Sequence, residues 1–263
     1  MTATLRARAR ARSRRPVPSR GRTSRTPGAF AAVYRLMLRN QATPGRVIGV
    51  LALGAGGMLL GLAVGLHDGI DPVKDGATLV NDYGLSVLVP VVALVFSSST
   101  LGDLVDDKTL VYIWLRPVNR LTVAAAAAGA AVTICLPAVT VPLVICAGLT
   151  GGGLALIGGT AVAAGVGVIG YCGMFTALGL RFKRALVWGL AYIVLWEWYV
   201  SSASRTASRL ALRAYTHSVV SEYTSVRFER ADLGLAAAVI VPVLVGAVFV
   251  LLTGRRLAKT PVD

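Results

Sequence analysis

Long apolar segments alternate with short polar segments along most of this chain. After residue 46, six apolar segments can be separated, each bounded by polar residues or glycines. They cover residues 47–66, 83–101, 121–149, 154–180, 185–200 and 233–253. Because about 20 apolar residues in a helix cross the hydrocarbon core of a bilayer, the pattern predicts six transmembrane helices.

The composition agrees with a membrane protein built from helices. The chain is 55% hydrophobic and only 15% charged, whereas a soluble domain carries about 25% charged residues. Lipid offers no hydrogen-bond partners to backbone groups, and a helix satisfies its own. The third and fourth segments exceed the length of one span, so we expect tilt or bends, with Pro137 and Pro142 bending the third. The predicted fold class is an all-α, polytopic membrane protein.

A short amphipathic segment, AFAAVYRLMLRN, precedes the first span. Apolar residues recur in it at helical spacing, at Phe30, Val33, Tyr34 and Met37. Arg35 and Arg39 occupy other positions, and the segment is too short and too charged to span. We predict an N-terminal helix lying in the cytoplasmic interface of the membrane.

The N-terminal tail is strongly basic. Its first 26 residues hold nine arginines, and the first acidic residue of the chain is Asp68. We expect residues 1–28 to be disordered and to touch anionic lipid, with residues 29–256 forming the membrane domain and 257–263 a short tail. Nucleic-acid binding is the less favoured alternative, since no aromatic residues accompany the arginines; an organelle transit peptide is a minor one.

The distribution of Lys and Arg predicts the orientation. With the N-terminus inside, 21 of the 27 basic residues lie on the cytoplasmic side. The positive-inside rule therefore places both termini in the cytoplasm. The last outer loop, residues 201–232, is the exception. Its arginines Arg205, Arg209 and Arg213 recur every four residues, which suggests one helix face and short interfacial or re-entrant helices.

Glycines in the first span indicate close helix packing. Gly57, Gly61 and Gly65 form a GxxxGxxxG pattern, which lets a second helix approach closely. The fourth span is also rich in glycine. The alternative is that both are merely glycine-rich membrane sequence.

The sequence lacks the common catalytic and metal-binding motifs. It contains no GxxxxGK[ST], GxSxG or HExxH pattern. Cys135 and Cys146 lie eleven residues apart, so a soft-metal site is conceivable, but small buried packing residues are the favoured interpretation. We therefore expect no metal and no cofactor in this chain.

Glu197 is the one acidic residue inside a predicted span. An ionisable residue in a membrane helix is a candidate for proton transfer or substrate binding. It lies between Trp196 and Trp198, near the predicted outer end of the fifth span. We therefore favour an interfacial polar residue close to water and keep the functional role as the alternative.

The segment between the second and third spans is the most distinctive part of the sequence. It reads DLVDDKTLVYIWLRPVNR from residue 103 to 120. Asp103, Asp106 and Asp107 are spaced i, i+3, i+4, so a helix places them on one side. Pro117 ends the element, and Asn119 can cap the third span. We predict a short amphipathic helix beneath the membrane, its acidic face toward the cytoplasm.

This segment resembles the cytoplasmic signature of ABC-2 type transporter permeases. That signature has an acid cluster, Gly-Thr-Leu, a hydrophobic stretch and Pro-Val-x-Arg. Lys108 stands where the family often has Gly, so the local turn can differ. The six spans, the inside termini and the N-terminal interfacial helix (Phe30, Tyr34, Arg35, Met37 and Arg39) are similar to the family layout. The likeness covers residues 29–256, but its specific part is the loop alone.

The resemblance implies a non-catalytic permease subunit of an exporter. Such a subunit pairs with a second permease, the same or different, and with two separate ATPase subunits that bind ATP and Mg. The cargo would be hydrophobic or amphiphilic. The loop would carry a coupling helix that docks on the ATPase. The residues implied in coupling are Asp103, Asp106, Asp107, Lys108, Thr109, Leu110, Pro117 and Arg120.

Two other classes remain open. One is an integral membrane enzyme that modifies lipids, which requires clustered Asp, Glu or His at membrane depth. The other is a membrane scaffold that recruits a cytosolic protein through the acidic helix. A co-purifying ATPase separates the permease from both.

Overall fold

The computed structural model describes residues 27–41, 43–67, 71–106, 119–200, 205–228 and 233–259. Helices account for the regular structure of these residues, without a strand among them, which confirms the all-α prediction. Labels beginning with η mark π-helical segments. The elements are α2 (Pro27–Gln41), α3 (Pro44–Gly65), α4 (Pro72–Leu79), η1 (Val80–Leu88), α5 (Val89–Asp106), α7 (Arg120–Leu149), α8 (Gly153–Arg181), α9 (Ala185–Tyr192), η2 (Ile193–Val200), α11 (Arg205–Ser208), α12 (Leu212–Thr224) and α13 (Leu235–Lys259).

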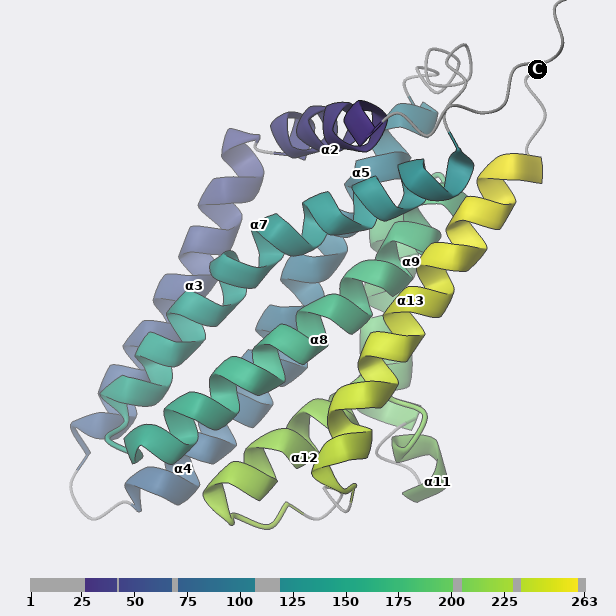
Figure 1. The fold of residues 1–263 in the computed structure, drawn as a ribbon. Helices are drawn as coiled ribbons and strands as arrows, with labels where there is room; N and C mark the ends of the chain where they lie inside the picture. The colour runs from purple at the N-terminus through teal and green to yellow at the C-terminus, as the bar shows by residue number, and fades with distance from the viewer. Residues whose placement is uncertain are drawn as a thin grey trace, which may run out of the picture.

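The long helices run between two ends of a bundle (Figure 1). Helix α2 lies across one end, near the start of α3 and α7 and the end of α5, α8 and α13. Helices α4, α11 and α12 lie at the opposite end. These are called the α2 end and the α12 end below.

Five helical segments are long and apolar enough to cross a membrane. They are Pro44–Gly65, Pro72–Asp103, Arg120–Leu149, Gly153–Arg181 and Leu235–Lys259. A shorter apolar helix, Ala185–Tyr199, corresponds to the predicted fifth span. The structure thus supports a multi-pass membrane protein whose spans match five of the six predicted segments by length and composition.

The second span begins eleven residues before its predicted start at residue 83. The signal is Asp71-Pro72, because the Asp71 side chain accepts hydrogen bonds from the backbone amides of Val73 and Lys74, and Pro72 occupies the first turn. The helix then continues through α4, η1 and α5. The polar residues Asn81 and Asp82 interrupt the apolar pattern without interrupting the helix.

Helices α5 and α8 form the centre of the bundle. Helix α8 packs against α5, α7, α12 and α13, and its Tyr171 and Phe175 are fully buried and stacked on each other. Helices α3 and α13 instead expose large apolar side chains such as Leu51 and Leu252. Exposed apolar faces of this kind suit contact with lipid.

Glycines permit the closest approaches between helices. A Cβ atom on Gly61 would lie 2.7 Å from the Cys146 carbonyl oxygen, and one on Gly65 would collide with the Leu149 backbone. The GxxxGxxxG face of α3 therefore packs against α7 of the same chain, with Gly57 against the Tyr83 ring. Helices α8 and α13 meet in the same way where Gly173 lies on Gly246.

Helix α2 is held to the bundle by its apolar face. Met37 is buried with residues of α5, α7 and α13, and the Tyr34 hydroxyl lies 2.7 Å from Thr133 Oγ1 in α7. Phe30 stacks on Tyr34 and stays partly exposed. Arg35 and Arg39 are exposed. The amphipathic pattern thus gives a helix with one docked face and one basic exposed face.

The arginines at residues 205, 209 and 213 do not share one helix face, contrary to our expectation. Arg205 belongs to α11, Arg209 lies in a turn, and Arg213 begins the separate helix α12. The interruption at residues 209–211 separates them because Ala211 is extended rather than helical.

Substituting Gly61 with Ala should destabilise the protein by about 1–3 kcal/mol, since the added methyl group meets backbone atoms that cannot move independently. The melting temperature of the detergent-solubilised protein measures this. Gly49→Ala is the matched control, because Gly49 lies in the same helix with open space around its Cα. Equal melting temperatures for Gly61→Ala and the wild type would contradict the packing.

Candidate functional site

The acidic segment between the second and third spans is flanked by α5 and α7 at the α2 end. Helix α5 ends at Asp106 and α7 begins at Arg120. The predicted coupling residues Asp107, Lys108, Thr109, Leu110 and Pro117 lie outside the described residues. The structure therefore gives the placement of both flanks of the segment.

Asp103 lies within the last turns of α5 rather than on a separate helix. Helix α5 continues from Val89 to Asp106, so its axis carries both Asp103 and Asp106. Our prediction of a separate flat helix starting at Asp103 was wrong at these residues. The physical reason is that no proline or glycine pair stops α5 before Asp106.

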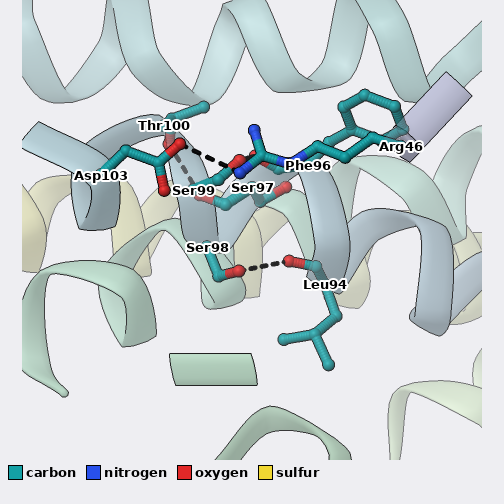
Figure 2. Close-up of polar contacts among 8 residues, drawn as sticks. All are labelled: Arg46, Leu94, Phe96, Ser97, Ser98, Ser99, Thr100 and Asp103. Carbon is teal, nitrogen blue, oxygen red and sulfur yellow. Dashed lines mark hydrogen bonds and ion pairs between the residues drawn. The ribbon is translucent and has the colours of Figure 1, made fainter. Parts of the chain in front are cut away.

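Asp103 forms an ion pair with Arg46 from the first turn of α3. The distance from Arg46 Nη2 to Asp103 Oδ2 is 3.0 Å (Figure 2). The side chains are 24% and 37% exposed, respectively. A pair this exposed contributes only about 0–1 kcal/mol. Arg46 Nη1 is buried and has no hydrogen-bond partner among the described residues.

Both charges occupy helix ends that disfavour them. Arg46 is a cation in the first turn of α3, and Asp103 is an anion near the end of α5. Each placement opposes the helix dipole by about 0.3–1 kcal/mol. The ion pair offsets this cost. The stability of α3 or of α5 alone therefore does not account for the presence of Arg46 and Asp103 at these positions.

A run of four hydroxyl residues precedes Asp103 in α5. Ser98, Ser99 and Thr100 each donate to a backbone carbonyl three or four residues earlier, at 2.6–2.8 Å, as Figure 2 shows. These bonds satisfy the hydroxyls within the helix. Ser97 Oγ is buried and finds no partner in the described part of the chain. The run is thus a polar stretch of an otherwise apolar helix.

Helix α7 begins with the cap that the sequence predicts. Asn119 Oδ1 accepts a hydrogen bond from the Leu121 amide at 3.1 Å. This side-chain acceptor satisfies one of the free amides at the helix start. This cap fixes the start of the third span at Arg120, the residue directly after Asn119. Helix α7 then continues through Pro137 and Pro142.

A second polar group lies at the α12 end, around Glu197. The Glu197 side chain is 1% exposed. Its Oε1 accepts from the Leu212 amide at 3.2 Å, and its Oε2 accepts from the Arg213 amide at 3.1 Å. The Tyr192 hydroxyl donates to Oε1 at 3.1 Å. We expected a residue close to water between two tryptophans, and burial by α12 corrects this.

Glu197 acts as the cap of α12. Ala211, at the N-cap position, has no side-chain oxygen to accept from the first amides of that helix. Glu197 supplies the acceptor from η2, and its negative charge suits a helix N-terminus. The Tyr171 hydroxyl faces the same carboxylate, outside hydrogen-bonding geometry. Sequence alone could not reveal this, because the cap lies far from the capped helix in the chain.

Ser86 joins the two π-helical segments to α12. The Trp198 indole donates to the Ser86 carbonyl oxygen at 3.3 Å, and His217 Nε2 lies 3.1 Å from Ser86 Oγ. Ser86 lies in the π-helical segment η1, and a carbonyl oxygen has two lone pairs, so it can accept from the Trp198 indole in addition to a backbone amide. The buried Asn81 side chain lacks a partner in the described residues.

The Ser86–His217 contact does not present an activated nucleophile. The Ser86 hydroxyl donates to the Asn81 carbonyl oxygen at 2.7 Å. Its proton is therefore not directed at His217, and the contact is satisfied when His217 Nε2–H donates to Ser86 Oγ. A serine nucleophile requires the opposite direction of donation. This geometry favours a contact that holds helices together.

The cysteines pack in the bundle. Cys146 lies against Gly61, and Cys135 neighbours Cys172 and points toward the Val92 carbonyl oxygen. Cys135 therefore faces Cys172 rather than Cys146. Within the described ranges, His, Cys, Asp and Glu form no group of three or more that could hold a metal ion.

Comparison with known proteins adds no assignment. No protein-family model, no curated protein and no solved structure matches this chain. The two polar groups therefore have to be interpreted from their own chemistry.

Substituting Glu197 with Ala should release α12. Hydrogen bonds to a charged group contribute about 1.5–3 kcal/mol, so trypsin should cleave at Arg209 and Arg213 about tenfold faster. Glu197→Gln should have an intermediate effect because it keeps one acceptor. Glu222→Gln, at an exposed position on α12, is the control. Unchanged cleavage in Glu197→Ala would exclude the capping role.

The histidine of α12 should make stability depend on pH. Burial by surrounding protein, together with the Arg213 charge, lowers the pKa of His217 to about 3. Below about pH 6.5 the unfolded chain binds a proton at His217 that the folded chain does not bind. The stability of the folded protein therefore decreases as the pH is lowered. The advantage in melting temperature of wild type over His217→Gln should therefore narrow between pH 7.5 and 4.5. His67→Gln, at an exposed position, is the control. A constant advantage would contradict the prediction.

Proposed function

We propose that this chain is the membrane permease subunit of an ABC-2 type transporter. It pairs with a second permease and with two separate ATPase subunits, and it exports a hydrophobic or amphiphilic cargo. The chain itself is not an enzyme, because ATP and Mg are bound by the partner. Its place is the plasma membrane, with six spans and both termini in the cytoplasm.

The observation that carries this proposal is the acidic segment and its position. Its sequence resembles the ATPase-docking loop of such permeases. Both flanks, the end of α5 and the start of α7, lie at the same end of the bundle as α2. An acidic segment that connects α5 to α7 is suited to receive force from a partner and to pass it into two long helices.

The arrangement of the helices is compatible with six spans. The apolar helix formed by α9 and η2 runs from the α2 end toward the α12 end between α8 and the last loop. If this helix is counted as a span, the chain crosses six times, and the last helix, α13, ends at the α2 end. The basic residues of α2 then lie on the side with most of the Lys and Arg residues.

A membrane enzyme has less support. The strongest catalytic arrangement among the described residues would be Ser86 with His217, and the direction of hydrogen bonding opposes it. Glu197 is occupied by the backbone of α12. A scaffold and a permease would both bind a cytosolic protein through the acidic segment. The identity of that protein, an ATPase or another protein, distinguishes them.

Reversing two charges in the acidic segment should remove the ATPase. After co-expression with a candidate ABC ATPase, Asp106→Arg/Asp107→Arg should reduce the co-purifying ATPase about tenfold, because a basic groove that accepts the acidic face would repel the two arginines. Quantitative gel analysis of the purified complex measures this. Asp82→Arg is the matched control, since Asp82 is exposed on η1, toward the other end. Absence of any ATPase with the wild type would overturn the proposed function.

A further inference from the structure

We propose that the Arg46–Asp103 ion pair ties α3 to α5, so that α3 follows α5 when the ATPase acts on the α2 end. Arg46 and Asp103 are then positioning residues, and the carboxylate of Asp103 does not itself hold the ATPase. This inference rests on the proposed function and adds the route by which movement reaches the first span.

The contacts of α3 show why a tie is needed at this end. The glycine contacts of α3 are made with α7 and Tyr83, and the closest of them, at Gly61 and Gly65, lie in the half of α3 toward the α12 end. Near the α2 end α3 exposes Val47, Ile48 and Leu51. The Arg46 guanidinium reaches across to Asp103 at 3.0 Å. The ion pair is therefore a polar contact between the first turn of α3 and α5.

The position of Asp103 favours transmission over docking. Asp103 is one turn before the end of α5, and Arg46 occupies one of its carboxylate oxygens (Figure 2). A displacement of the end of α5 must move this carboxylate, and the paired guanidinium moves with it. Helix α3 and the adjoining α2 would then follow, because only residues 42 and 43 separate the two helices.

The exposure of the pair makes it suitable for a contact that carries movement. A partly exposed ion pair adds little stability, so its removal leaves the fold intact. Reversal of one charge places like charges together and separates the helices at this end. Reversal of both restores attraction. The pair can thus be tested without unfolding the protein.

The experiment uses the permease co-purified with its ATPase. The variants are Arg46→Glu, Asp103→Arg and the double Arg46→Glu/Asp103→Arg, with Arg39→Glu, an exposed arginine on α2, as control. The measurements are the amount of ATPase bound, kcat and KM for ATP hydrolysis by the complex, and the melting temperature. Each single variant should keep the ATPase and the KM but lose kcat about fivefold, a coupling effect of ordinary size. The double variant should recover kcat.

Each other outcome overturns the inference in a distinguishable way. Loss of bound ATPase in Asp103→Arg but not in Arg46→Glu would show that Asp103 docks the partner directly. Unchanged kcat in both single variants, or no recovery in the double variant, would show that the pair transmits nothing. If kcat decreases only in variants whose melting temperature also decreases, the ion pair has a structural role and does not transmit movement. Absence of ATPase from every preparation would remove the proposed function and this inference together.

Discussion

Close backbone contact between helices is the interaction on which the rest of the structure depends. Glycines bring α3 onto α7 and α8 onto α13, where a side chain would meet backbone atoms. In an apolar surrounding, helices gain little by hiding apolar surface, so packing and hydrogen bonds have to hold them. The long helices can therefore cross a membrane and still form one bundle, with α5 and α8 at its centre.

The polar contacts are arranged around this packing at the two ends. At the α2 end, Arg46 pairs with Asp103. At the α12 end, Glu197 caps α12, and Ser86 receives both Trp198 and His217. Each contact joins elements that glycine packing does not join. The ends are thus held together by polar side chains.

The sequence predicted most of the fold and only part of the candidate site. Apolar length identified the five long helices, and Asn119 marked the start of the third span correctly. The start at Pro72 was missed although Asp71-Pro72 is a clear local signal, because polar residues in α4 and η1 obscured the apolar pattern. Asp103 was singled out from its spacing, but its ion-pair partner Arg46 was not predicted.

The sequence by itself determined which segments are helical, apolar and long enough to span, because these properties depend on neighbouring residues. It also determined the acidic segment on which the proposed function rests. Only the tertiary structure decided that Gly61 faces α7, that Glu197 is buried beneath α12, and that Arg46 reaches Asp103. These contacts join residues from 15 to 85 positions apart in the chain, and no local pattern specifies which helices become neighbours in a bundle.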